Sequence, residues 1–178
     1  MEKLKKKVIK LLYRSKRNPI AKDLKTSPKY KQRIVKKNMT VKTETNFYKT
    51  FKRCLENGSE KYIITRIESY VTPGFPDCII YHKDIGFFTV ELKVVRRNKK
   101  GVGKIAVSPL QIAWNMLHAA HNAPSFILIH DPGKGATKLF SSAKLLELRD
   151  NDYDSVDGAL WTGTLGPGCG SELLKLLK

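Results

Sequence analysis

The chain has 178 residues, a formal net charge of +18, and a hydrophobic content of 41%. This size and composition are enough for one domain with its own core plus an extension, and the positive charge favours a polyanionic partner, nucleic acid before an anionic membrane. No apolar run approaches the length of about 20 residues that crosses a bilayer, and the basic start of the chain lacks a signal-peptide cleavage site, so we expect no membrane segment.

The positive charge is concentrated at one end of the chain. Residues 1–38 contain 15 lysines and arginines against two acidic residues, a net charge of +13, whereas residues 39–178 carry 19 against 14, a net charge of +5. We therefore expect a basic, flexible N-terminal arm over residues 1–38 and a folded domain over residues 39–178. The arm would bind nucleic acid through phosphates; the alternative is a solubilising tail.

The three cysteines, Cys54, Cys78 and Cys169, lie far apart in the chain and form no C-x-x-C pair. This spacing predicts neither a zinc site nor a disulfide framework. It fits a reducing compartment, and we expect a cytoplasmic, intracellular protein. Cys78 lies in an apolar run and is expected to be a small buried hydrophobe.

A helix is expected from Thr40 or Thr43 to about Glu56, because apolar residues recur there at helical spacing. Glu44 lies on or beside the inward face of this helix. A carboxylate in that position requires a charged or metal partner. The alternative is a helix-boundary glutamate that the helix dipole favours.

Three strands are expected next, over residues 62–70, 77–81 and 87–95, with a hairpin turn at residues 82–86 joining the second and third. Asp77 opens the second strand, and Glu91 and Lys93 share one face of the third. If these strands pair, two carboxylates and an ammonium group converge. Such a cluster suits phosphodiester hydrolysis assisted by Mg²⁺, and the alternative is an ordinary cross-strand ion pair.

A basic segment over residues 96–104 follows the third strand directly. We expect this segment to contact DNA beside the site, and the alternative is a solvated turn. The candidate nucleic-acid contacts are Arg96, Arg97, Lys99, Lys100 and Lys104.

A second helix is expected from Ser108, a capping residue followed by Pro109, to about His121. Gln111 lies on its polar face. The remaining expected elements are strands at 125–130 and 137–140, a short helix at 142–148, an acidic loop at 150–157, a glycine-rich stretch at 161–170 and a terminal helix at 171–178.

The motif Pro76-Asp77 and the motif Glu91-Leu92-Lys93 resemble the two defining motifs of the PD-(D/E)XK nuclease superfamily. The resemblance implies that Asp77 and Glu91 are metal ligands, that the carbonyl oxygen of Leu92 is a third, and that Lys93 is catalytic.

Two further positions match superfamily features in kind. Glu44 matches a glutamate on the helix before the first catalytic strand, where it would be an additional metal or water ligand. The segment Ser108-Pro109-Leu110-Gln111 matches an S-x-x-Q pattern of the VRR-NUC branch and several phage enzymes, which places Gln111 beside the metal. The resemblance spans roughly residues 40–148.

The expected fold class is therefore α/β, a restriction-endonuclease-like αβββαβ core with a mixed central sheet flanked by helices. The expected function is a deoxyribonuclease that uses Mg²⁺, with Mn²⁺ as an alternative, and cleaves DNA endonucleolytically in phage-type DNA degradation, recombination or repair. A Holliday junction resolvase-like enzyme, a DNA-binding protein without turnover and an RNA-binding protein remain alternatives. DNA is the expected partner, and a homodimer is left open.

Overall fold

The structure is a computed structural model that describes residues 43–57, 61–67 and 74–177. Chain contacts divide the protein into Met1–Met39 and Thr40–Lys178, and all described residues belong to the second unit. The expected basic arm over residues 1–38 and the expected helix start at Thr40 lie outside the described residues.

The described residues form the following elements, in chain order: α3 (Glu44–Glu56), β1 (Tyr62–Arg66), β2 (Cys78–His82), β3 (Gly86–Val94), β4 (Arg96–Arg97), β5 (Gly103–Lys104), α4 (Pro109–Ala120), β6 (Ser125–Asp131), β7 (Ala136–Ser141), the 3₁₀ turn η2 (Ser142–Lys144), α5 (Leu145–Asp150), the 3₁₀ turn η3 (Tyr153–Ser155), β8 (Trp161–Gly163) and α6 (Cys169–Leu177). The helix and strand types agree with the sequence prediction wherever that prediction placed an element.

Six of these strands form one mixed sheet in the order β1-β2-β3-β6-β7-β8. The pair β3–β6 is parallel, and every other neighbouring pair in this sheet is antiparallel. A parallel pair needs a long crossover connection, and here that connection contains α4. The expected α/β class, with a mixed sheet flanked by helices, is confirmed.

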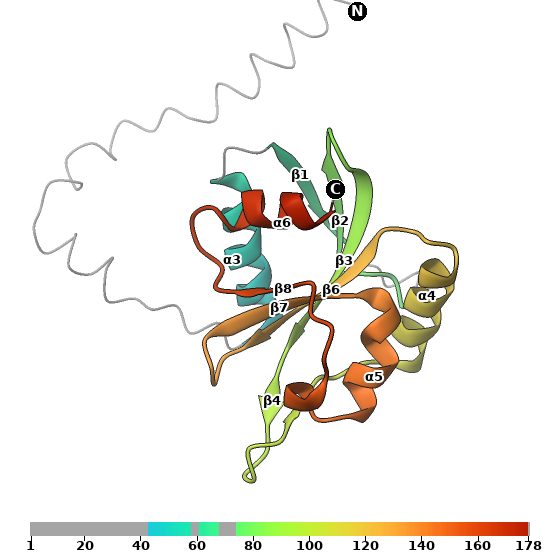
Figure 1. Cartoon of the computed structure of the whole chain (residues 1–178), viewed down its shortest axis with the longest axis vertical. Helices are drawn as coiled ribbons and strands as arrows, with labels where there is room; N and C mark the ends of the chain where they lie inside the picture. Colours follow the sequence, from blue (N-terminus) through green and yellow to red (C-terminus); the bar gives the residue numbers. More distant parts are fainter. Residues whose placement is uncertain (1–42, 58–60, 68–73, 178) are drawn as a thin grey trace, which may run out of the picture. The chain divides into compact units, whose positions relative to one another are not determined.

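The helices cover the sheet on both faces (Figure 1): α3 and α6 lie on one side, and α4 and α5 on the other. Each side has its own buried cluster. Because side chains alternate along a strand, the buried apolar residues of β3, Phe88, Val90, Leu92 and Val94, all lie in the cluster under α3, and Val95, just after the strand, lies in the cluster with α4 and α5.

Side-chain caps set where the two long helices begin. Thr43 accepts a hydrogen bond from the backbone N–H of Asn46 and is the N-cap of α3. Ser108 is the N-cap of α4 and forms a reciprocal capping box with Gln111. Such caps satisfy backbone donors that the first helical turn leaves unpaired, and the predicted capping role of Ser108 is confirmed.

The prediction of no disulfide framework was wrong, and the cysteine pattern therefore no longer supports a reducing compartment. Cys54 on α3 and Cys169 at the start of α6 form a disulfide, with Cα atoms 6.2 Å apart and a sequence separation of 115. Because α3 and α6 pack on the same face of the sheet, the fold brings together residues that the sequence separates. Cys78 is buried and unpaired, as expected, and burial, followed by the charge of Asp77, raises the pKa of its thiol to about 12.

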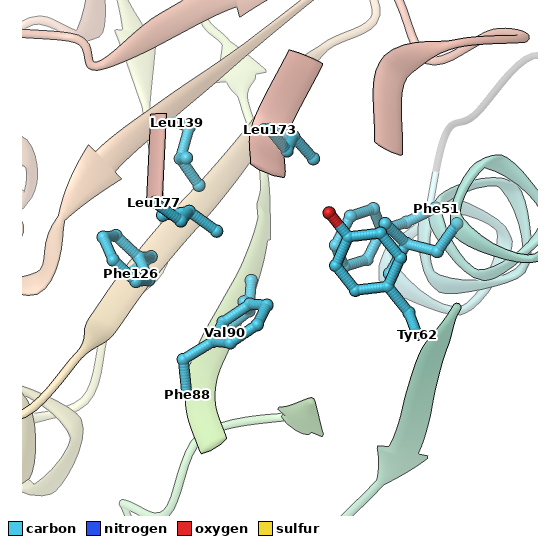
Figure 2. A pocket seen from close by; sticks show the side chains of 9 residues that line it. Phe51, Tyr62, Phe88, Val90, Phe126, Leu139, Leu173 and Leu177 are labelled. Atoms are coloured by element: carbon cyan, nitrogen blue, oxygen red, sulfur yellow. The ribbon is translucent and has the colours of Figure 1, made fainter. Parts of the chain in front are cut away.

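The C-terminal residues, whose role the sequence left open, complete the sheet and cover its α3 face. The predicted glycine-rich stretch contains β8, whose Trp161 indole N–H donates to Glu172 on α6 at 2.9 Å. The hydroxyl of Tyr62 on β1 donates to the carbonyl oxygen of Gly170 at 2.7 Å. Figure 2 shows the apolar space that α6 covers, with Leu173 and Leu177 facing the rings of the sheet and of α3.

We predict that reducing the Cys54–Cys169 disulfide lowers the free energy of unfolding by about 2–4 kcal/mol, because the bond closes a long loop in the unfolded chain. Urea unfolding with and without reductant measures this change. The double variant Cys54→Ser/Cys169→Ser should be insensitive to reductant, whereas Cys78→Ala should keep the full sensitivity. If the urea midpoint of the unmodified protein is the same with and without reductant, the pairing is contradicted.

Candidate active site

The pairing of β2 with β3 brings the two sequence motifs together. Cys78 pairs with Val90 in the antiparallel register, so Asp77, one residue earlier, lies opposite Glu91. The carboxylate of Asp77 accepts a hydrogen bond from the backbone N–H of Leu92 at 2.8 Å. This bond fixes the side chain of the first motif directly to the backbone of the second.

Glu91 and Lys93 form a buried ion pair on the α4 side of β3. The Lys93 ammonium nitrogen lies 2.7 Å from Glu91 Oε1. The side chain of Glu91 is 0% exposed and that of Lys93 is 6% exposed. Gln111 on α4 donates to the same Oε1 at 2.6 Å. The second oxygen, Oε2, is buried and has no hydrogen-bond partner among the described residues, which is costly for a carboxylate unless another group joins the site.

The electrostatics of the pair are set by burial and by neighbouring carboxylates. Burial, followed by the negative charge of Asp77, raises the pKa of Glu91 to about 7, although Lys93 acts in the opposite direction. Burial lowers the pKa of Lys93, but the charges of Glu91, Glu44 and Asp77 raise it overall, so the ammonium group stays protonated at neutral pH. The negative charges of Asp77, Glu91 and Glu44 therefore outnumber the single positive charge of Lys93 at this site.

Gln111 is held in place from two directions. Its side-chain oxygen accepts from the backbone N–H of Ser108 at 3.0 Å within the capping box. Behind it, the buried Asn115 donates to the Gln111 carbonyl oxygen at 2.8 Å and accepts from Ser125 of β6 at 3.2 Å. Ser125 in turn accepts from Thr89 of β3 at 2.9 Å. The amide of Gln111 is thereby oriented towards Glu91 by contacts that reach back to the strands.

Gly74 positions the loop that precedes Asp77, a role that sequence reasoning did not assign. Its backbone has φ +90°, and a Cβ atom there would lie 2.5 Å from the carbonyl oxygen of Leu110. Only glycine combines that conformation with such a close approach. The first motif is therefore packed against the first turn of α4, the turn that contains Gln111.

Glu44 lies in the first turn of α3 and is exposed. Its charge contributes to the raised pKa of Glu91, and its position also suits a glutamate favoured by the helix dipole. Within the part of the chain that the structure describes, no group of three or more His, Cys, Asp or Glu side chains is close enough together to hold a metal ion. The closely placed carboxylates are those of Asp77 and Glu91, and the role of Glu44 as a ligand stays a prediction.

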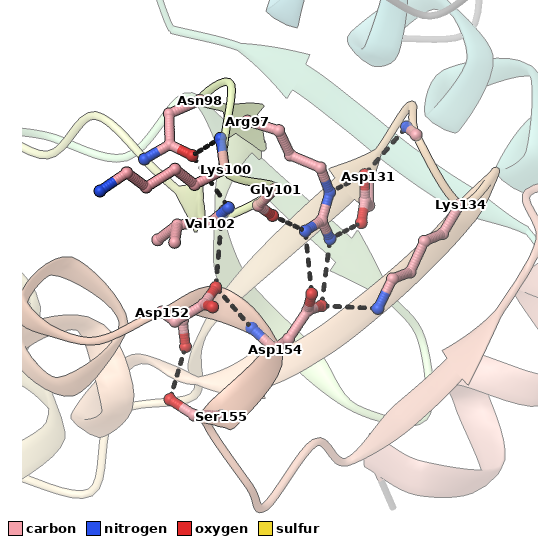
Figure 3. Close-up of polar contacts among 12 residues, drawn as sticks. Arg97, Asn98, Lys100, Gly101, Val102, Asp131, Lys134, Asp152, Asp154 and Ser155 are labelled. Atoms are coloured by element: carbon pink, nitrogen blue, oxygen red, sulfur yellow. Dashed lines mark hydrogen bonds and ion pairs between the residues drawn. The ribbon is translucent and has the colours of Figure 1, made fainter.

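The basic segment after β3 is a small hairpin, β4–β5, and two of its five predicted DNA contacts have partners inside the domain. Arg97 bonds to Asp131 at the end of β6 and to Asp154 in η3, the latter at 2.8 Å (Figure 3). Lys104 donates to the carbonyl oxygens of Asp150 and Asn151 at the end of α5, at 2.7 and 2.8 Å. These contacts hold the hairpin against the domain.

The other three predicted contacts, Arg96, Lys99 and Lys100, are exposed. Arg97 also donates to the carbonyl oxygen of Gly101 across the turn at 2.7 Å, which fixes the loop that carries Lys99 and Lys100. Lys104 is exposed as well, so the hairpin presents four exposed basic side chains on a supported backbone, and their contact with nucleic acid stays a prediction.

Comparison with models of protein families, with curated proteins and with solved structures finds no match to this chain. None of the described helices has the length and apolar content to cross a membrane. The interpretation of the site rests on the geometry given above.

We predict that Gly74→Ala destabilises the protein by more than about 2 kcal/mol, because it adds a close contact with Leu110 to the cost of the left-handed conformation. The matched control is Gly135→Ala, where φ is +63° and no neighbouring atom lies within 4 Å, so that only the conformational cost of about 1 kcal/mol applies. Thermal unfolding of both variants measures the difference. Equal losses would show that the loop before Asp77 is not tightly packed.

We predict that Arg97→Met costs about 2–3 kcal/mol at neutral pH, because it leaves the carboxylate of Asp131, only 1% exposed, without its cation. Lys134→Met, which removes the more exposed partner of Asp154, should cost less than about 1 kcal/mol. Urea unfolding of both variants over a range of pH measures these costs.

The cost of Arg97→Met should also depend on pH. Burial raises the pKa of Asp131, but the hydrogen bonds from Arg97 and from the Gly133 N–H lower it overall, and those from Arg97 and Lys134 lower the pKa of Asp154. The stabilisation is then complete above the ordinary carboxyl pKa of 3.8 and is lost as the pH falls below it. A cost that stays constant down to pH values well below 3.8 would contradict this role of Arg97.

Proposed function

We propose that this protein is a metal-dependent deoxyribonuclease with a restriction-endonuclease-like core, and that Asp77, Glu91 and Lys93 form its active site. One observation carries the proposal: a buried carboxylate whose first oxygen is held by Lys93 and Gln111 and whose second oxygen lacks a partner beside another carboxylate. Burying such a carboxylate is energetically unfavourable, and groups buried in this way are concentrated at functional sites.

A divalent cation fits this donor set. The unpartnered Oε2 of Glu91 offers an oxygen ligand, and a cation would relieve the repulsion through which Asp77 raises the pKa of Glu91. Hard oxygen donors of this kind suit Mg²⁺, and also Mn²⁺. Asp77 and Glu91 would hold the ion with the Leu92 carbonyl oxygen, and Glu44 would add a ligand or hold a water. When bound, the ion polarises the phosphate and lowers the pKa of a coordinated water.

The protein's own groups have separate tasks in this proposal. Lys93 keeps its proton at neutral pH and would stabilise the negative charge that develops on the phosphate or orient the attacking water. Gln111 holds Glu91 Oε1, so that Oε2 is left for the ion. The N–H of Leu92 fixes Asp77. Because these contacts exist before substrate binds, the site needs little reorganisation.

DNA would approach along the exposed basic side chains. Arg96, Lys99 and Lys100 on the β4–β5 hairpin would contact phosphates, and Arg97 and Lys104 would support the hairpin that carries them. The basic arm over residues 1–38 would add salt-sensitive affinity without sequence preference. Such an enzyme would act inside a cell, including a phage-infected one, on DNA in degradation, recombination or repair.

We predict that Asp77→Asn and Lys93→Met each lower metal-dependent cleavage by at least about 100-fold, because each removes a group that acts on the reacting phosphate or its ion. Purified protein would be incubated with supercoiled plasmid and with a labelled four-way junction, in Mg²⁺, Mn²⁺ or EDTA. Lys175→Met, an exposed change on α6, is the control and should leave cleavage unchanged.

Each remaining outcome of this assay has a defined meaning. Cleavage that survives in both Asp77→Asn and Lys93→Met would place the activity elsewhere. Intact substrates together with DNA binding in EDTA would replace the enzyme by a DNA-binding protein without turnover. Preferential cleavage of the junction would select a resolvase-like enzyme.

A further inference from the structure

The sheet face that carries Asp77 and Glu91 continues towards the β2–β3 turn as a row of apolar and aromatic side chains. Side chains alternate along a strand, so Asp77 shares its face with Tyr81, and Glu91 shares the same face with Phe87. Tyr81 pairs directly with Phe87 on β3 and with Ile63 on β1. The row therefore begins at the candidate active site and extends across three strands.

Two of these three side chains, on β1 and β3, are strongly exposed, and Tyr81 is half-buried. Phe87 is 68% exposed and Ile63 is 63% exposed. The rings of Tyr81 and Phe87 lie 4.9 Å apart at an interplanar angle of 48°. On the opposite face of the same strands, Ile80 and Phe88 are buried in the core with α3. The exposed row is therefore not part of either hydrophobic core.

A second aromatic group lies on the other side of Asp77. Phe75, two residues before it, contacts Trp114 of α4 with ring centroids 5.3 Å apart, and Trp114 stacks on His118 at 3.5 Å and 13°. Trp114 follows Gln111 by three residues, so both lie on the same side of α4. Aromatic rings thus flank the site along the direction of β2.

We propose that this face binds single-stranded DNA, whose bases stack on Phe87 and Tyr81 while the backbone passes the Asp77–Glu91 site; the proposal rests on the nuclease function above. Unpaired bases expose π-faces that stack on aromatic side chains without sequence preference, whereas the bases of a duplex are already stacked on one another. At about 3.3 Å per residue, Tyr81 lies about 13 Å along the strand from Asp77, so one bound strand can reach both.

Charge and area support this occupant over a second copy of the chain. Residues 39–178 carry a net charge of +5 and residues 1–38 a further +13, which complements phosphate and opposes self-association. The large, strongly exposed apolar side chains of this face are Ile63 and Phe87, a small area compared with the roughly 800 Å² per partner of a stable protein interface.

Binding measured in EDTA tests the proposal without requiring cleavage. Fluorescence anisotropy would follow the unmodified protein with a labelled thymidine oligonucleotide of about 20 nucleotides and with a duplex of equal length. Phe87→Ala and Phe87→Leu should both weaken single-strand binding by about tenfold and leave duplex binding nearly unchanged. Leu176→Ala, an exposed apolar change on α6, is the control and should have no effect.

Unchanged single-strand affinity in both Phe87 variants would overturn the proposal, and so would an equal loss of affinity for single strand and duplex. A third contradicting result is single-strand binding that Phe87→Leu preserves and Phe87→Ala loses, because this would indicate an apolar contact rather than stacking. Sedimentation velocity measures the oligomeric state of the same variants. A dimer of the unmodified protein that dissociates in Phe87→Ala would assign the face to a second copy of the chain. If the Phe87 variants cleave DNA and bind single strands as the unmodified protein does, this inference fails and the nuclease proposal stands. If the unmodified protein binds single strands through Phe87 but does not cleave them, the nuclease proposal fails and the binding face stands.

Discussion

The burial of one charged pair in the central strand determines how the rest of the domain is arranged. Glu91 and Lys93 lie on the buried part of β3, where their side chains are 0% and 6% exposed and a charge without a partner would be strongly unfavourable. The contacts around the pair offset this unfavourable burial: Lys93 neutralises Glu91, and Gln111 donates a hydrogen bond to Glu91. The first turn of α4 carries Gln111 to the pair, and Gly74 lets the loop before Asp77 lie against that turn, because a Cβ atom there would meet the Leu110 backbone.

Local pattern in the sequence was sufficient for the long helices and strands and for the motifs, but it missed the short elements β4, β5, η3 and β8. The helix from Thr43, the strands around Asp77 and Glu91, and the capped helix from Ser108 each follow from periodicity and capping residues within a short window. The convergence of Asp77 and Glu91 followed from pairing two strands joined by a short turn, because few registers are available to a hairpin.

Contacts between distant residues could not be predicted in the same way. Nothing near Cys54 indicates that it pairs with Cys169, and nothing near Arg97 indicates Asp131 and Asp154 as partners, because these pairs depend on how α6 and η3 pack. A run of positive charge suggested five DNA contacts, yet charge alone does not distinguish a side chain that faces solvent from one that holds a loop.

The alternation of β3 has a consequence for the middle residue of the E-x-K motif. Leu92 contributes only its backbone to the proposed site, while its side chain lies in the core beneath α3. The chemistry is thus indifferent to the identity of this residue, and the shape of the opposite core selects it. Substitutions in the core around α3 would therefore change the proposed site from the opposite face of the sheet, because they would shift the backbone of Leu92.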